Sequence, residues 1–294
     1  MLIKIFCEID DFCKLFEKQF NTRLLAGGKG QRNRSCSLLA SEVMTICVYF
    51  HESGFRTFKD YYEKHVLIHM QNDFHGLVSY NRFIELRQKI VLPLLAFVQL
   101  KSMGKCTGVS FIDSFALDVC HIRRASSHKV FKGLAQKGKT STGWFYGLKL
   151  HTVINHLGEI IAFSITPGNI SDCNKHIILS LTKKLYGKLF GDKGYIINQH
   201  LFEKLYLNGV RVITKLRKNM KNKLMLPEDA YLLKKRGIIE SVGNLLKAHL
   251  LLEHSRHRSV WGFLLHIFST LAAYKFREKK PLIKHYTNIL PVIC

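Results

Sequence analysis

The spacing of hydrophobic residues changes near residue 105, and this change constrains the fold more than any other feature of the sequence. Before it, apolar side chains such as Phe12, Leu15 and Phe16 recur every three or four residues, which is the period of an amphipathic helix. After it, short runs such as 107–113 and 144–154 are rich in β-branched and aromatic residues, as strands are. The sequence therefore predicts an all-helical N-terminal region followed by an α/β domain.

Capping signals divide the first hundred residues into short helices. Thr57 opens a capping box, and Ser79 is placed to cap a further helix. Helices of this length are compatible with a helix-turn-helix that binds DNA and equally with a plain helical bundle. In the first case three residues would face DNA, namely Asn81, Arg82 and Arg87.

The α/β part has a readable order of elements. Strands are expected over 107–113, 144–154, 159–166, 188–190 and 210–216, and helices over 172–186, 198–207 and 228–249. Three strands joined by turns, followed by alternating strands and helices, predict a mixed sheet flanked by helices. The expected domains are a helical region at 1–104, a catalytic α/β domain at 105–250, and a C-terminal helical extension at 251–294 that packs on the catalytic domain.

The basic residues are concentrated in the α/β part. The chain carries 45 Lys and Arg against 21 Asp and Glu, a net charge of +24. Residues 1–100 hold 13 basic and 10 acidic residues, whereas 101–294 hold 32 and 11. Such an excess predicts a polyanionic partner, above all nucleic acid, because the charges repel one another unless an anion neutralises them. Charge alone does not distinguish an enzyme from a DNA-binding protein.

Several other classes of protein are excluded. The longest apolar stretch, 90–100, is about half the length of a membrane-spanning helix. Acidic residues directly after the first apolar residues do not suit a secretory signal. Eight scattered cysteines without a Cys-x-x-Cys pair favour neither a zinc finger nor a disulfide framework. A cytoplasmic, nucleoid-associated protein with no membrane or small-molecule partner is expected.

Three acidic residues fall where a metal site could form. Asp113 ends the first predicted strand, Asp192 ends the fourth, and Glu240 lies on the last long helix. If the first and fourth strands are neighbours, the two aspartates face each other, and adjacent carboxylates normally need a cation. Each acid taken alone is more often a turn residue, a cap or a surface ion-pair partner than a ligand. Only 11 acids follow residue 100, however, so three at suitable element ends favour a metal site.

The same helix carries polar residues along one face. Arg236, Glu240, Asn244 and Lys247 lie within one stripe at the spacing of an α-helix. Such a stripe suits a carboxylate that binds a metal while Lys247 contacts a phosphate. The alternative is a surface ion pair between Arg236 and Glu240, which contributes a few tenths of a kcal/mol.

Six short segments occur in an order typical of one known family. They are IDS at 112–114, GWFYGLKLH at 143–151, TPGN at 166–169, GDKGY at 191–195, IES at 239–241 and EHSRHRS at 253–259. With them the chain resembles the DDE transposases of bacterial insertion sequences, and more narrowly insertion-sequence family nine hundred and eighty-two. The resemblance extends from the N-terminal helices to about Pro281.

This resemblance implies an RNase H-like catalytic domain in which Asp113, Asp192 and Glu240 bind two Mg²⁺ ions, with Mn²⁺ as a substitute. It implies metal-dependent phosphodiester cleavage at the element's ends and strand transfer to target DNA, carried out by a homodimer that holds two ends. Lys247 matches a basic residue of the family that contacts DNA, whereas Leu233 stands where related transposases carry a tyrosine.

Other assignments are open at this stage. Trp144 either stacks on an unpaired base or fills the core, and Ser114 is a rival nucleophile without an obvious base. The alternatives to a transposase are a repurposed DNA-binding protein without activity and an RNase H-like nuclease without strand transfer. The residues expected to contact DNA are Arg123, Arg124, Lys149, Lys193, Lys215, Arg217, Lys218, Arg236, Asn244 and Lys247.

Overall fold

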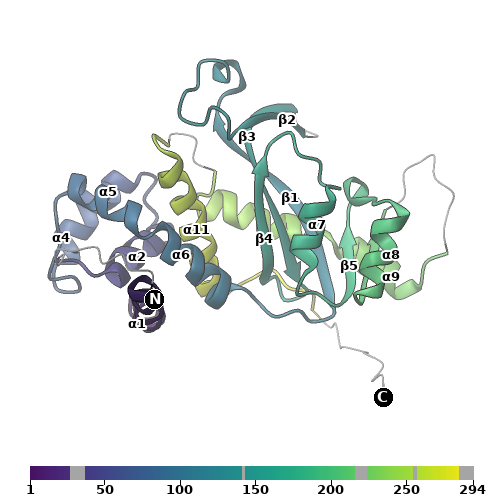
Figure 1. Ribbon diagram of the computed structural model, residues 1–294, viewed down its shortest axis with the longest axis horizontal. Helices are drawn as coiled ribbons and strands as arrows, with labels where there is room; N and C mark the ends of the chain where they lie inside the picture. Colours follow the sequence, from purple (N-terminus) through teal and green to yellow (C-terminus); the bar gives the residue numbers. More distant parts are fainter. Residues whose placement is uncertain (27–36, 141–142, 216–223, 254–256, 285–294) are drawn as a thin grey trace. The chain divides into compact units, whose positions relative to one another are not determined.

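The computed structural model describes residues 1–26, 37–140, 143–215, 224–253 and 257–284. The chain forms two compact units, shown in Figure 1. We call Met1–Ser102 together with Leu246–Arg277 the helical unit, and Met103–Leu245 together with the segment from Glu278 onward the α/β unit. The central α/β unit is thus inserted, in sequence, between two parts of the helical unit.

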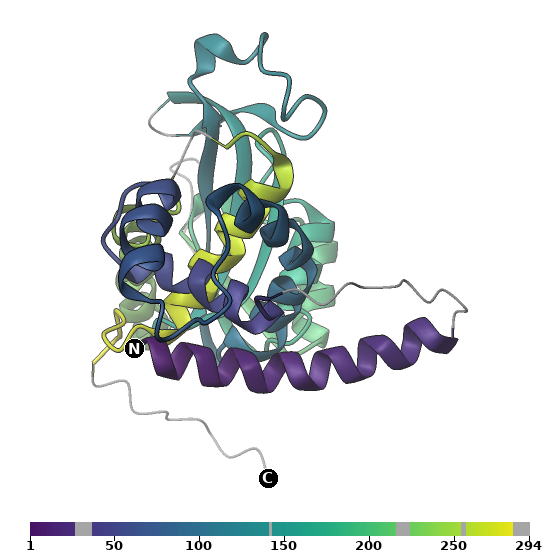
Figure 2. The same cartoon turned by 90° about the vertical axis from the view of Figure 1, so that its left-hand side faces the viewer.

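Short helices make up the first part of the helical unit. Figure 2 shows α1 as a long helix (purple). The hydroxyl of Thr57 accepts a hydrogen bond from the amide of Asp60, and that of Ser79 accepts one from Arg82, which confirms both predicted caps. The elements are α1 (Leu2–Ala26), α2 (Ala40–Tyr49), η1 (Phe50–Glu52), α3 (Phe58–Tyr61), η2 (Tyr62–Val66), α4 (Leu67–His69), α5 (Tyr80–Lys89), α6 (Val91–Phe97) and η3 (Val98–Ser102).

The last helix, α11 (Val260–Phe276), belongs to the helical unit. It is apolar around nearly its whole circumference, and residues such as Phe263, Ile267 and Leu271 are buried. A helix without a polar face must be enclosed on all sides, and α11 packs against α2, α5 and α6. The sequence predicted that 251–294 packs on the catalytic domain; the structure groups α11 with the N-terminal helices and the segment from Glu278 with the α/β unit.

The α/β unit contains one mixed sheet. Its strands are β1 (Val109–Cys120), β2 (Gln136–Thr140), β3 (Gly143–Asn155), β4 (Ile160–Pro167), β5 (Gly187–Gly191) and β6 (Val210–Thr214). The central order is β4, β3, β1, β5, β6, with β2 extending the β4 edge of β3. Pairing is antiparallel among β1, β3 and β4, and parallel from β1 through β5 to β6. This is the RNase H-like arrangement that the resemblance implied.

Helices cover this sheet. The side chains of Ile112 and Leu189 pack with those of Ile178 on α7 and Leu205 on α8 in one buried cluster. The segment between β1 and β2 projects beyond the sheet in both views (Figures 1 and 2, teal). The helices of the unit are α7 (Lys175–Thr182), α8 (Gln199–Leu207), α9 (Pro227–Lys235) and α10 (Gly237–Asn244), with short turns η4 (Ile122–Arg124) and η5 (Lys193–Tyr195).

The predicted helix over 228–249 is interrupted twice. Pro227 begins it, as expected, but α9 ends at Lys235 and α10 starts at Gly237. After Asn244 the chain continues as a π turn, η6 (Leu245–His249). A π turn holds more residues than an α-helical turn, so the predicted stripe does not extend unchanged to Lys247.

Candidate functional site

Strand register brings two of the predicted acids together. In the parallel pair of β1 and β5, Phe111 lies opposite Phe190. Asp113 and Asp192 each follow two residues later, so they leave the paired segment side by side. Asp113 was predicted to end its strand, but β1 continues to Cys120 because β3 still pairs with it there. What ends near Asp113 is the pairing with β5.

Arg236 joins the third acid to the first. It lies between α9 and α10, and its Nη1 is 3.2 Å from Oδ2 of Asp113. Its Nη2 donates a hydrogen bond of 2.9 Å to Oε1 of Glu240, one helical turn later. The Arg236 side chain is only 14% exposed, whereas that of Glu240 is 59% exposed. The stripe predicted on this helix therefore exists from Arg236 to Glu240, and it points toward β1.

The three acids are close enough to influence one another electrostatically. Burial raises the pKa of Asp113 to about 6, and the negative charges of Asp192 and Glu240 add to that increase. The amide of Ser114 and the guanidinium of Arg236 act in the opposite direction. A buried carboxyl beside two further carboxylates is an arrangement that a cation stabilises.

The side chains suit a divalent cation in kind, because carboxylate oxygens are the ligands that Mg²⁺ prefers. Within the described ranges, no three Asp, Glu, His or Cys side chains are gathered closely enough to hold an ion as they stand. The guanidinium of Arg236 supplies the positive charge between Asp113 and Glu240.

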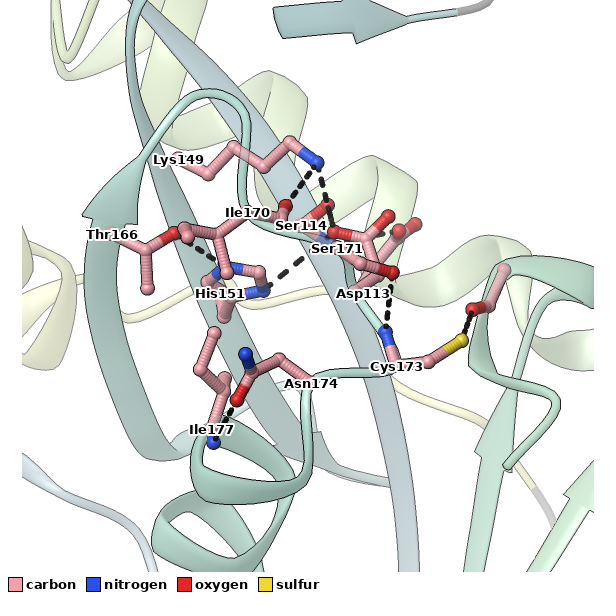
Figure 3. Close-up of polar contacts among 12 residues, drawn as sticks. Asp113, Ser114, Lys149, His151, Thr166, Ile170, Ser171, Cys173, Asn174 and Ile177 are labelled. Atoms are coloured by element: carbon pink, nitrogen blue, oxygen red, sulfur yellow. Dashed lines mark hydrogen bonds and ion pairs between the residues drawn. The ribbon is translucent and has the colours of Figure 1, made fainter. Parts of the chain in front are cut away.

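A fourth acid, Asp172, was missed by the sequence analysis, which used it only as the start of a helix. Its Oδ1 accepts hydrogen bonds from the hydroxyl of Ser114 at 2.9 Å and from Nζ of Lys149 at 3.2 Å. Lys149 also donates to the carbonyl of Ile170 at 2.9 Å (Figure 3). The one available signal was its isolation, since Asp172 is the only acid between Glu159 and Asp192.

A buried histidine faces the same carboxylate. His151 is fully buried, and one ring nitrogen, Nε2, lies 2.9 Å from the hydroxyl of Thr166. The other, Nδ1, is 3.8 Å from Oδ1 of Asp172 (Figure 3) and has no hydrogen-bond partner in the described part of the chain. Burial lowers the pKa of His151 to about 4 despite the opposing charge of Asp172, so the ring is neutral near pH 7.

The loop that carries Asp172 is fastened to the turn that carries Asp192. The thiol of Cys173 donates to the carbonyls of Gly194 and Ile196. Tyr195, in that turn, is 2% exposed, and burial raises the pKa of its hydroxyl. The charges of Asp172, Asp113 and Asp192 contribute to this increase in that order, so all three aspartates lie around Tyr195.

The residues predicted to contact DNA differ in their surroundings, and Arg236 contacts Asp113 and Glu240. Arg123, Arg124, Lys193, Lys215 and Asn244 are exposed, as DNA contact requires. Lys149 is buried and committed to Asp172, so its role is inside the unit. Lys247 belongs to the helical unit, where it pairs with Glu253 at 3.0 Å, and Arg217 and Lys218 lie outside the described residues.

Trp144 is not a core residue. Its side chain is 62% exposed near the start of β3, and Nζ of Lys139 on β2 lies 5.8 Å from the centre of its ring. An exposed indole beside a lysine suits stacking on a nucleic-acid base. Of the two readings of Trp144, core filling is therefore wrong.

The helical unit contains a cleft of about 910 Å³. Its lining includes Lys59, Tyr80, Asn81, Arg87 and Arg258. The guanidinium of Arg87 lies 3.9 Å from the centre of the Phe58 ring. Arg82, by contrast, is paired with Glu85 at 2.5 Å on the surface. The helix-turn-helix interpretation stays a prediction.

No helix within the described ranges is long and apolar enough to cross a membrane.

Residues 103–260, more than half of the chain, match the family model described as "Transposase DDE domain". No curated protein matches the sequence.

Three solved structures show weak similarity. They are the Mos1 strand transfer complex (12% identity, 90% of this chain and 87% of that chain, TM-score 0.23), the Mos1 transposase paired-end complex with left transposon end (13%, 88% and 86%, 0.25) and the mariner Mos1 paired end complex with Mg (13%, 91% and 88%, 0.23). The assignment of an RNase H-like fold comes from the strand order and the pairing directions of the sheet.

Proposed function

Because the chain belongs to the family with a transposase DDE domain, we propose that it cleaves DNA at the ends of an insertion sequence and joins the freed 3′ ends to target DNA. The observation that carries this proposal is that Asp113 and Asp192 leave the β1–β5 pairing side by side, while Arg236 joins Asp113 to Glu240. Water is the proposed nucleophile for cleavage, and the freed 3′-hydroxyl is the nucleophile for joining.

Asp113, Asp192 and Glu240 would hold two Mg²⁺ ions, which when bound stabilise the attacking and leaving oxygens at phosphorus. Backbone donors orient the aspartates for this task. The amide of Ser114 donates to Oδ1 of Asp113 at 2.8 Å, and the amide of Gly194 donates to Oδ1 of Asp192 at 2.5 Å. Arg236, which is held by its contacts with Asp113 and Glu240, would offer its guanidinium to the reacting phosphate.

The DNA-binding surface is proposed to lie on the chain between β1 and β3. No acid occurs between Val119 and Gly158, and the exposed basic residues there attract phosphates without opposing charges. Trp144 is placed to stack on an unpaired base beside them. The basic residues are Arg123, Arg124, Lys129, Lys132, Lys137 and Lys139, with Lys193 and Lys215 exposed elsewhere in the unit.

Two finer assignments complete the proposal. The six ordered segments support placement in insertion-sequence family nine hundred and eighty-two. Two copies of the chain are expected to pair two element ends, since transposition joins both ends to one target.

The test is a cleavage and joining assay with labelled DNA from the element's flanks, a target plasmid and Mg²⁺ or Mn²⁺. We compare the natural protein with Asp192→Asn and with a matched control, Glu203→Gln, whose exposed carboxylate on α8 accepts a hydrogen bond from Gln199. Metal-dependent nicking and joining should disappear in Asp192→Asn and persist in the control. Nicking without joining would instead indicate a nuclease, and binding without cleavage a repurposed DNA-binding protein.

A further inference from the structure

The two carboxylate oxygens of Asp172 have different surroundings. Oδ1 is occupied by donors from two strands, the hydroxyl of Ser114 on β1 and Nζ of Lys149 on β3. Oδ2 has neither of these contacts. It lies 3.7 Å from the position that a Cβ atom on Gly194 would take, and Oδ1 of Asp192 lies 2.8 Å from the same position. One oxygen therefore fixes the side chain, and the other is left on the side of Asp192.

The hydrogen bonds to Oδ1 hold the Asp172 side chain in one orientation, which leaves Oδ2 oriented for a ligand. Metal-binding carboxylates are themselves hydrogen-bonded by surrounding groups, which orient them and lower the cost of ordering on binding. The side chain of Lys149 is 11% exposed and that of Asp172 is 28% exposed, so the pair is sheltered while Asp172 stays accessible.

Two buried polar groups also point to a ligand here. His151 is fully buried and directs Nδ1 toward Asp172 without a hydrogen-bond partner in the described chain. The hydroxyl of Tyr195 is buried where the charges of Asp172, Asp113 and Asp192 meet. Lys149 and Arg236 supply two positive charges beside the four carboxylates of Asp113, Asp172, Asp192 and Glu240, so the site still favours a further cation.

We propose that Asp172 is a fourth carboxylate of the metal site and contributes Oδ2 to a divalent cation together with Asp192. This inference builds on the proposed function, because it adds a ligand to the site formed by Asp113, Asp192 and Glu240. Ser114 and Lys149 are positioning residues for Asp172, and they act through its Oδ1.

The direct test is titration of the full-length, metal-free protein with Mn²⁺ in a calorimeter. Asp172→Asn should bind Mn²⁺ at least about tenfold more weakly than the natural protein, and Glu203→Gln should bind it normally. Ser114→Ala tests the positioning role, because it removes one hydrogen bond to Asp172 and keeps the carboxylate and its contact with Lys149. We expect it to weaken Mn²⁺ binding less than Asp172→Asn does, since the ligand itself remains.

A second variant changes the preferred metal. Asp172→Cys replaces a hard oxygen ligand by a soft thiolate, so it should weaken Mn²⁺ binding and retain or strengthen Cd²⁺ binding relative to the natural protein. If Asp172 only supported the fold, this substitution would weaken the binding of Mn²⁺ and of Cd²⁺ equally. Thermal unfolding without metal verifies that each variant is folded.

The outcomes distinguish this inference from the proposed function. If Asp192→Asn loses Mn²⁺ binding while Asp172→Asn keeps the natural affinity, Asp172 is not a ligand and the three-acid site stands. If Asp172→Cys weakens Mn²⁺ and Cd²⁺ equally, the inference also fails. If the natural protein binds no Mn²⁺ at all, the proposed function and this inference fall together.

Discussion

Gly243 on α10 lies directly against the ring of Phe115 on β1. A Cβ atom at Gly243 would be 2.3 Å from Cε1 of that ring, which is closer than any real contact. Phe115 stands two residues after Asp113 and Gly243 three after Glu240. The absence of a side chain at Gly243 therefore sets how closely Glu240 approaches the strand that carries Asp113.

Replacing Gly243 by alanine should separate these two elements. Alanine normally favours a helix over glycine by about 1 kcal/mol, but here the added methyl group must displace the Phe115 ring or the helix. We expect a net loss of about 1–3 kcal/mol in the free energy of unfolding and a fall in DNA cleavage. Gly237→Ala is the matched control, because nothing lies within 4 Å of a Cβ atom there. Equal stability of the two variants in urea denaturation would refute this account.

The raised pKa of Asp113 should make stability depend on pH. Its pKa is about 6 in the folded chain, against an ordinary 3.8, so the folded state holds this proton more tightly. The contribution of Asp113 to stability therefore falls as the pH rises from about 4 to about 6. In metal-free buffer, Asp113→Asn should gain about 3 kcal/mol relative to the natural protein across this window.

The comparison with Asp113→Asn is needed because another group acts in the opposite direction. The pKa of His151 is lowered to about 4, from 6.5, so its contribution to stability rises with pH between these values. Taking the difference between two proteins that both contain His151 cancels its effect. Denaturation curves at pH 4 and pH 7 measure the difference, and a value that does not change with pH would contradict the prediction.

A buried carboxylate should hold α9 to the sheet. Asp229 is fully buried and pairs with Lys188 on β5 at 2.7 Å and with Arg211 on β6 at 3.6 Å. Asp229→Ala removes the buried partner of both cations, although Lys188 keeps Glu228, and should cost about 1–3 kcal/mol in the free energy of unfolding. Glu228→Gln is the control, because Glu228 also contacts Lys188, at 2.9 Å, but is 47% exposed. That change should cost less than about 1 kcal/mol.

The exposed indole of Trp144 should serve DNA and not the fold. Trp144→Ala should leave the melting temperature within a degree or two, because the ring buries little surface. We expect about tenfold weaker binding of DNA with unpaired terminal bases, since one stacked base contributes about 1–3 kcal/mol. Trp261→Ala is the control, with the chain's other tryptophan, which is 52% exposed on α11. An equal loss of affinity in both variants would contradict a role specific to Trp144.

The parts of the fold that local signals specify could be predicted from the sequence. The caps at Thr57 and Ser79 and the strands around Ile112 and Val153 are encoded within a few neighbouring residues. The strand β2 could not be predicted, because Gln136–Thr140 has no hydrophobic alternation and is a strand only through its pairing with β3.

The candidate site likewise has some residues that the sequence could identify and others that depend on tertiary contacts. Asp113 and Asp192 could be selected because each stands near the end of a recognisable strand, although their assignment as metal ligands stays a proposal. The network around Asp172 could not be found, since it joins residues that are 23 and 58 positions away in sequence. For the same reason Lys149 was placed among the DNA contacts, when the sheet encloses it beside Asp172.

The insertion of one unit within the other determines the order in which the protein can be completed during synthesis. The first 102 residues leave the ribosome early, but α11, which their helices enclose, is synthesised last. The central sheet and the helices that cover it are already available by then, since domains fold as their segments emerge. The apolar surfaces of the N-terminal helices that pack against α11 therefore stay uncovered until translation has passed Phe276. A chain that ends before Val260 lacks α11, so its helical unit cannot be completed although the central sheet is already present.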